Sequence, residues 1–139
     1  MLNDIAICQA VLNALPEATL IKDDSLQLVF VNKRACDFFG YSREELVGQN
    51  FTFFMTADQA ARHTSRALKV LKSGEQLESE EVITDGANKS RTVLIRKSRI
   101  TLNNRFYVLS ILSDISLLRS SEAQIRYLAY HDTLTGLPN

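Results

Sequence analysis

The chain has 139 residues, of which 45% are hydrophobic and 23% are charged, and this composition is ordinary for one globular domain. Its formal net charge is zero because 16 basic residues balance 16 acidic ones, so it lacks the positive surplus of nucleic-acid-binding proteins, and we exclude that class. No apolar run approaches the roughly 20 residues that cross a bilayer, and the first residues do not have the pattern of a signal peptide, so we expect a soluble, cytoplasmic chain with no membrane segment.

The first predicted element is an amphipathic helix at residues 2–15, which we assign as a flanking segment at 1–15. Its apolar stripe consists of Ile5, Cys8, Leu12 and Leu15. Two β-rich runs follow at 18–23 and 26–32, and the Asp-Ser pair between them predicts a hairpin.

The middle of the chain is predicted to be helical. Residues 32–40 and 42–48 form two short helical runs, each ended by a glycine. Residues 57–73 place small and apolar side chains on one helical face, and Gly74 supplies the end of that helix. This is the longest helix that we predict within the domain.

Three further β-rich runs, at 77–85, 91–102 and 105–116, complete the predicted domain. Turn residues lie between them, namely Asp85-Gly86 and Asn103-Asn104. The order of two strands, helices and three strands predicts an α+β fold, with a five-stranded antiparallel sheet and helices on one face. We expect this domain to span residues 16–116.

The last predicted helix covers residues 117–131 and forms a linker. Leu118, Ile125 and Leu128 lie at heptad spacing, which is typical of a helix that pairs with a second copy. The same pattern fits a single amphipathic helix that packs on its own domain, so both interpretations stay open.

Residues 30–51, FVNKRACDFFGYSREELVGQNF, resemble the front half of a PAS sensory domain. In that family a strand ends at an asparagine, here Asn32, that starts a short helix, and Phe-Gly-Tyr-Ser and Glu-Glu-Leu-Val-Gly segments follow. The resemblance continues to residue 116 and implies the PAS fold. Asp114, Ile115 and Ser116 resemble the Asp-Ile-Thr junction that leads into an output helix, which implies that they form the signal junction.

The end of the chain, HDTLTGLPN, resembles the first segment of a GGDEF domain, which is the diguanylate cyclase fold. That family typically starts with Asp-x-Leu-Thr-Gly-Leu-x-Asn-Arg, and its catalytic loop with metal-binding carboxylates lies much further along. The resemblance implies that residues 132–139 begin such a domain. We therefore expect a homodimeric sensor that controls a GGDEF domain in cis and has no catalytic activity or metal site of its own.

A PAS domain that senses a small molecule holds it between the sheet and the long helix, so the cofactors known in the family can be compared with this sequence. LOV-type flavin photosensors need a cysteine where Phe51 stands and a glutamine where Leu112 stands, which excludes their photochemistry. Non-covalent flavin binding remains open. His63 lies eleven residues before Gly74, where it resembles the proximal ligand of haem-binding PAS sensors.

The simpler interpretation of His63 is a surface or rim histidine, because it lies on the flank of the apolar stripe beside Arg62. Similarly, we expect the thiols of Cys8 and Cys36 to be buried. The five phenylalanines from Phe38 to Phe54 are expected to pack in the core.

The charged runs at 80–81 and 96–99 are expected on solvated strand faces, where opposite charges pair across the sheet. An anionic ligand attracted to the arginines is the alternative.

Three functions remain open from sequence. The first is a PAS module that dimerises and signals to a GGDEF domain that controls cyclic di-GMP. The second is a ligand-gated sensor of haem, through His63, or of flavin. The third is a ligand-free module for protein–protein interaction, which predicts a pocket filled by side chains and an exposed apolar patch on the sheet.

Overall fold

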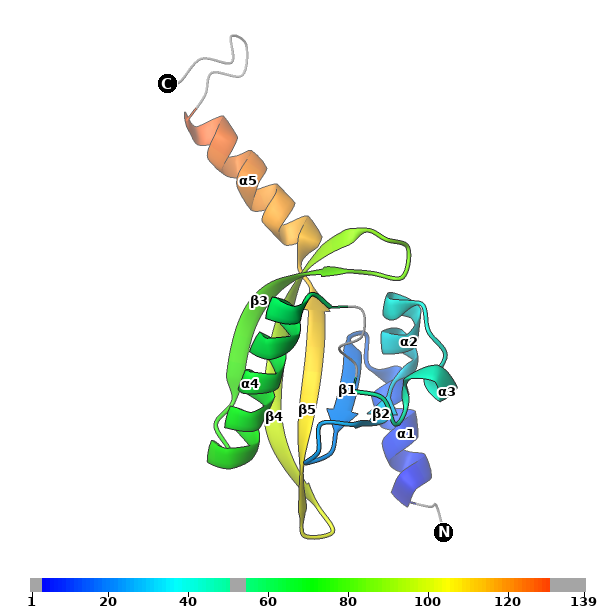
Figure 1. The fold of residues 1–139 in the computed structure, drawn as a ribbon. Coiled ribbons are helices and arrows are strands. Elements are labelled where there is room, and N and C mark those ends of the chain that lie inside the picture. The colour runs from blue at the N-terminus through cyan, green and yellow to red at the C-terminus, as the bar shows by residue number, and fades with distance from the viewer. Residues whose placement is uncertain (1–3, 51–54, 131–139) are drawn as a thin grey trace.

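The computed structural model describes residues 4–50 and 55–130, and Figure 1 shows their arrangement. The elements are α1 (Asp4–Ala14), β1 (Ala18–Lys22), β2 (Leu28–Val31), α2 (Lys33–Phe39), α3 (Arg43–Leu46), α4 (Ala57–Ser73), β3 (Leu77–Thr84), β4 (Ser90–Leu102), β5 (Arg105–Asp114) and α5 (Ser116–Tyr130). Every element follows the predicted order. The predictions for Phe51, Phe53 and Phe54 and for the GGDEF-like end at 132–139 lie outside the described residues.

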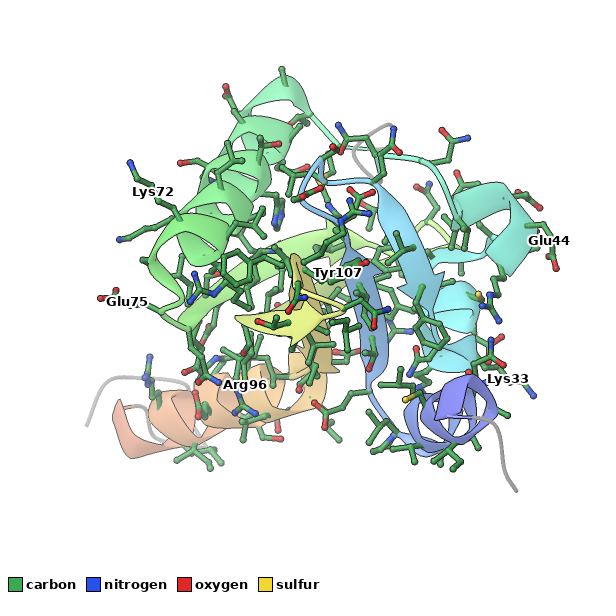
Figure 2. All side chains as sticks on the ribbon, turned by 90° about the horizontal axis from the view of Figure 1, so that it is seen from below. Lys33, Glu44, Lys72, Glu75, Arg96 and Tyr107 are labelled. Atoms are coloured by element: carbon green, nitrogen blue, oxygen red, sulfur yellow. The ribbon has the colours of Figure 1, made fainter. Side chains whose placement is uncertain are left out.

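The five strands form one antiparallel sheet in the order β2-β1-β5-β4-β3, which confirms the predicted α+β fold. The last strand in the chain, β5, therefore lies at the centre of the sheet, between β1 and β4. Seen from below, α2, α3 and α4 lie on one side of the sheet, whereas α1 and α5 lie on the other (Figure 2). The helix α5 continues from β5 and extends away from the sheet (Figure 1).

The helix α4 covers β4 and β5, and its sequence fixes both of its ends. Thr56 and Gln59 form a reciprocal capping box at the start, and Gly74 ends the helix with a φ of 73°. Three side chains of α4 are buried, and they are His63, Ala67 and Val70. Their spacing of four and three residues places them on one stripe, which faces the sheet.

Asn32 joins the N-terminal segment to the sheet and to α2. The residue is fully buried, and its side-chain oxygen accepts hydrogen bonds from the backbone N–H groups of Thr19 and Ala35, both at 2.9 Å. Its side-chain nitrogen donates to the carbonyl oxygens of Leu12 at 2.8 Å and Glu17 at 2.9 Å. One asparagine thus caps α2 and holds both the last turn of α1 and the residues that follow it.

The turns combine predicted and unpredicted backbone conformations. Asn103 and Asn104 have φ values of 50° and 61°, as a tight hairpin requires, so the predicted turn is confirmed. Leu26 also has a positive φ, 62°, which is unusual for leucine. Its side chain is buried in a cluster with Ala67, Val70 and Val108, and this burial offsets the strained backbone.

Two predictions about packing have different outcomes. Phe39 is buried and meets Phe38 edge-on with ring centres 4.9 Å apart, which confirms a core role for these two rings. Cys8 is exposed and Cys36 is half-buried, so the prediction of buried thiols was wrong. The reason for Cys8 is that α1 leaves much of its surface uncovered, as its neighbour Ile7 is also exposed.

Candidate functional site

The candidate site is a small cavity between the inner face of the sheet and α4. Its volume is about 20 Å³, which is room for about one water molecule. Its lining consists of Leu20, Lys22, Phe39, Met55, His63, Ile83, Ile95, Lys97, Ser110 and Leu112. Polar and charged side chains therefore meet apolar ones inside the fold.

The strand register places three of the polar residues on one face of the sheet. Ser110 on the central strand β5 lies directly opposite Leu20 of β1 and Lys97 of β4. Lys22 follows Leu20 by two residues, so it points to the same face. Lys97 and Ser110 are therefore direct neighbours, and Lys22 lies diagonally from Ser110 because its direct partner on β5 is Val108.

Both lysines are buried, with exposed fractions of 7% for Lys22 and 6% for Lys97. The Lys97 ammonium donates a hydrogen bond to the Ser110 hydroxyl at 3.3 Å. Among residues 4–50 and 55–130, the Lys22 ammonium has no hydrogen bond or ion pair. Lysine is rarely buried to this extent without a partner.

Burial lowers the pKa of both lysines, because the interior solvates their charged form poorly. The pKa of Lys22 falls to about 8 from this cause. The pKa of Lys97 falls to about 7 through burial first and then through the positive charges of Lys22 and Arg66. Each lysine therefore loses its proton more easily than a lysine in water.

The prediction that residues 96–99 lie on a solvated strand face was wrong for Lys97. Val93, Ile95 and Lys97 alternate in phase along β4 and all point inward. Arg96 points the other way and pairs with Glu78 on β3 at 3.3 Å. Glu80 pairs instead with Arg119, and Glu81 pairs with two arginines of α4, so the predicted pairing of the run at 80–81 with the run at 96–99 was wrong.

The prediction of a surface or rim position for His63 was also wrong, because its exposed fraction is 5%. The stripe that includes Ala67 and Val70 turns His63 toward the sheet. Burial first, and then the positive charge of Lys97, lower the pKa of His63 to about 4, although Glu81 acts in the opposite direction. The imidazole is therefore neutral at neutral pH.

A neutral imidazole is a suitable haem ligand, but the cavity beside His63 is too small for haem. Pockets for ligands of drug or cofactor size typically enclose about 300 to 1,000 Å³. The cavity has about 20 Å³, so the residues that line it fit neither a haem nor a flavin in this arrangement.

Glu81 is the acidic group beside the cavity. Its carboxylate pairs with Arg62 at 3.3 Å and with Arg66, and both arginines come from α4. Burial alone raises the pKa of Glu81, but the hydrogen bond and charge of Arg66 hold it below its usual value. Glu81 thus joins β3 to α4, and its oxygens are used by the arginines.

The predicted signal junction at Asp114, Ile115 and Ser116 is closely bonded to the start of β4. The Ile115 N–H donates to the carbonyl oxygen of Thr92 at 2.8 Å, and the Thr92 N–H donates to the Ser116 hydroxyl at 2.9 Å. The Ser116 N–H donates to the Asp114 carboxylate at 2.9 Å. The guanidinium of Arg91 lies between Asp114 at 3.5 Å and Asp85 at 2.9 Å.

The predicted seam residues lie on α5 and are exposed. Leu118, Ile125 and Leu128 have exposed fractions of 54%, 66% and 53%. Near its start, α5 is attached to β3 by the ion pair of Arg119 with Glu80. The helix therefore starts on the sheet and presents apolar side chains that its own domain does not cover.

Lys22, Lys97 and Ser110 were not predicted as site residues, although a signal for the two lysines is present in the sequence. Lys22 is in phase with Ala18 and Leu20 along β1, and Lys97 is in phase with Val93 and Ile95 along β4. A lysine at an inward position of a buried strand is the pattern that identifies them. Lys72, by contrast, points away from the molecule on α4 (Figure 2).

Within the described residues, no helix combines the length and the apolar character that crossing a membrane requires.

Comparisons with known proteins agree with this architecture. A family model described as PAS domain matches residues 16–117. The PAS domain of a protein from Colwellia psychrerythraea superposes with a TM-score of 0.69 at 16% identity, over 83% of this chain and 99% of that one.

Two curated proteins are similar over nearly the whole chain. An uncharacterized protein of Sinorhizobium fredii, y4lL, is 29% identical over 134 residues, which is 93% of this chain and 16% of that protein. The cyclic di-GMP phosphodiesterase PdeR of Escherichia coli is 25% identical over 139 residues, which is 97% of this chain and 21% of that protein. The chain thus spans about a fifth or less of the length of these relatives.

Proposed function

This chain belongs to the PAS domain family, and from that premise we propose that it is the sensory module of a cyclic di-GMP signalling protein. In this proposal the module forms a homodimer and passes its state through α5 to a GGDEF domain in cis that starts at Asp132. The protein that contains it acts in the cytoplasm. PAS domains are sensory domains of signalling proteins, so the new content of the proposal is the output and the route to it.

The proposed output rests on two similarities. The segment from Asp132 to Asn139 is similar to the start of a GGDEF domain. The E. coli relative that this chain resembles over 97% of its length acts on cyclic di-GMP. Because the chain spans 21% of that relative, the comparison supports a shared type of sensor ahead of a cyclic di-GMP output, and not a shared activity.

The observation that carries the proposed dimer is the uncovered apolar face of α5. Leu118, Ile125 and Leu128 are each more than half exposed, on a helix that extends away from its own sheet (Figure 1). Exposed apolar surface is stabilised by burial at about 25 cal/mol per Å². Two copies of α5 that pair along these residues would bury them, as in a short coiled coil. Ile7 and Val11 on α1 are also exposed.

The proposed route for the signal is the bonded junction between the sheet and α5. Ser116 is hydrogen-bonded to Thr92 of β4 and to Asp114 of β5, so a shift between these strands moves the start of α5. Arg119 adds a contact with Glu80 of β3. A change in the cavity, which β4 and β5 also line, therefore has a covalent and hydrogen-bonded path to the helix pair.

A second candidate function, the ligand-free interaction module, is favoured by the small cavity. Side chains fill the space between the sheet and α4 except for about 20 Å³. Val82, Leu102 and Phe106 are exposed apolar residues on the strands. This candidate predicts that no small molecule changes the stability of the chain.

The dimer is tested by the mass of the purified chain in light scattering. We expect twice the 15.7 kDa of one chain, and we expect Ile125→Asp to shift the mass toward the monomer, because a carboxylate in an apolar seam must be desolvated. The matched control is Leu102→Asp, which changes an apolar residue of 49% exposure at the far end of β4. A dimer that Ile125→Asp leaves intact would remove α5 from the interface.

A further inference from the structure

We propose that the turn between β3 and β4, residues 85–89, is a latch that couples the end of α2 to the signal junction at the start of α5. This β3–β4 latch gives α2 a route to α5 that does not pass through the small cavity under α4. The inference rests on the proposed function only for the meaning of a moved α5 as a signal. The coupling itself is a property of the described residues.

One end of the β3–β4 latch is bonded to the end of α2, toward which the turn extends from the sheet (Figure 1). The Gly86 N–H donates a hydrogen bond to the Phe38 carbonyl oxygen at 2.8 Å. Phe38 lies in the last turn of α2, where carbonyl groups have no partner within the helix. The latch therefore satisfies a polar group that the helix itself cannot satisfy.

The backbones of the latch and of α2 approach so closely that position 86 has no room for a side chain. A Cβ atom at Gly86 would lie 2.7 Å from the Cα and N atoms of Gly40 and 2.8 Å from the carbonyl carbon of Phe39. These are backbone atoms, so no side chain can rotate away to make room. Gly86 does not have a positive φ, which means that glycine is needed there for space and not for backbone conformation.

The other end of the latch is joined to the signal junction by charged side chains. One oxygen of the Asp85 carboxylate accepts from the N–H groups of Ala87 and Lys89, both at 2.9 Å, and this fixes the shape of the turn. The other oxygen accepts from Arg91 at 2.9 Å, and Arg91 also pairs with Asp114 at 3.5 Å. The hydrogen bond from Arg91 is the main cause that holds the pKa of Asp85 below its usual value, so the pair is charged at neutral pH.

The latch has open space beside it, which lets it move between its two attachments. A groove of about 430 Å³ is lined by Asp85 and Ala87 of the latch and also by Glu17 and Asp114. A second groove of about 380 Å³ is lined by Asp85, Gly86 and Asn88. Residues 86–90 are exposed. A segment that is held at its ends and only loosely packed along its sides has the freedom that a two-state element needs.

A displacement of α2 therefore has a defined consequence at α5. If the end of α2 moves, Gly86 moves with it and shifts Asp85 relative to Arg91. Arg91 precedes Thr92, whose backbone is hydrogen-bonded to Ile115 and Ser116. The coupling is reciprocal, so loosening the junction should also loosen the contact between the latch and α2.

The test is hydrogen exchange at single amides of the whole 139-residue chain, followed by NMR. Gly86→Ala separates the latch from α2. We expect it to speed exchange at the amides of Ile115 and Ser116 by about fivefold, which is the effect of losing one hydrogen bond. The amide of Val108 in β5 reports global unfolding and serves as the reference.

The matched control is Gly48→Ala. Gly48 has a φ of 87°, and a Cβ added there would have nothing within 4 Å, so the substitution strains the backbone without a clash. Exchange at Ile115 and Ser116 should then change only as much as exchange at Val108.

A double-mutant cycle tests the route through Arg91. Arg91→Ala breaks the side-chain link between the latch and Asp114. In the chain that carries Arg91→Ala, we expect Gly86→Ala to add less than about twofold at the amide of Ser116, because the link that it acts through is already lost.

If Gly86→Ala does not fold, Asp85→Asn decides. It keeps the side-chain oxygen that accepts from Ala87 and Lys89 and removes the charge that holds Arg91. We expect it to speed exchange at Ser116 in the unmodified chain and to add little in the chain that carries Arg91→Ala.

Three outcomes would overturn the proposal. They are unchanged exchange at Ile115 and Ser116 relative to Val108, equal acceleration by Gly48→Ala, and effects of Gly86→Ala and Arg91→Ala that simply add. These measurements require neither a dimer nor an output domain. A failure of the latch and a failure of the dimer test with Ile125→Asp can therefore be told apart.

Discussion

Lys97→Met should stabilise the protein at neutral and mildly acidic pH, although it removes a side-chain hydrogen bond. The pKa of Lys97 is lowered from 10.5 to about 7 in the folded chain. This difference corresponds to a penalty on the order of 5 kcal/mol for holding the charged lysine in the interior below about pH 7. Loss of the bond to Ser110 costs about 1 kcal/mol in the opposite direction. We expect a net gain of about 2 to 4 kcal/mol near pH 6.

The sign of the pH dependence follows from proton binding. Between about pH 7 and 10.5 the unfolded chain keeps the Lys97 proton and the folded chain does not, so the unmodified protein becomes more stable as the pH rises through this window. Lys22 adds the same trend from about pH 8, and it remains in the variant. The advantage of Lys97→Met should therefore shrink as the pH rises and disappear near 10.5.

The assay is urea unfolding followed by circular dichroism at several pH values, in buffers free of carboxylate ions. Lys69→Met, which changes an exposed lysine on α4, should match the unmodified chain within about 0.5 kcal/mol at every pH. A Lys97→Met variant that is less stable than the unmodified chain near pH 6, or whose advantage does not depend on pH, would show that burial of the charged lysine does not destabilise the fold.

Two further predictions concern the asparagine at the start of α2 and the signal junction. Asn32→Asp should lower the free energy of unfolding by about 3 to 5 kcal/mol, because the side chain loses its hydrogen bonds to the Leu12 and Glu17 carbonyls and places a buried negative charge beside them. Urea unfolding measures this loss, and Asn13→Asp at an exposed position is the control. A loss below about 1 kcal/mol would contradict the prediction. Arg91→Ala should speed hydrogen exchange at the amides of Ile115 and Ser116, because the ion pair of Arg91 with Asp114 is lost. The amide of Val108 in β5 serves as the reference. Exchange rates at the junction that are the same in the variant and the unmodified chain would argue against a role for Arg91 there.

Much of the fold could be predicted from sequence because local chemistry specifies it. Gly74 ends α4, Asn103 and Asn104 form a turn, and β-rich runs of sequence lie between such signals. The sheet order could not be obtained in this way, because pairing between β1 and β5 joins residues about ninety positions apart and leaves no local signal.

The site was harder to predict, because burial depends on what covers a surface. The charged run at 96–99 has the composition of a solvated strand, yet the phase of β4 turns Lys97 inward under α4. His63 was misassigned for a related reason, since the apolar stripe of α4 is wide enough to include it. Cys8 shows the reverse error, because an apolar stripe on α1 does not guarantee that another element covers it.

The measurement that tests the central claim most directly is cyclic di-GMP turnover by the longer protein that contains this chain, with and without Ile125→Asp. We predict that Ile125→Asp changes turnover at least about tenfold, while Leu102→Asp, an apolar residue of similar exposure away from α5, leaves it unchanged. Equal turnover by the unmodified protein, Ile125→Asp and Leu102→Asp would show that α5 does not carry the signal and would contradict the proposed function.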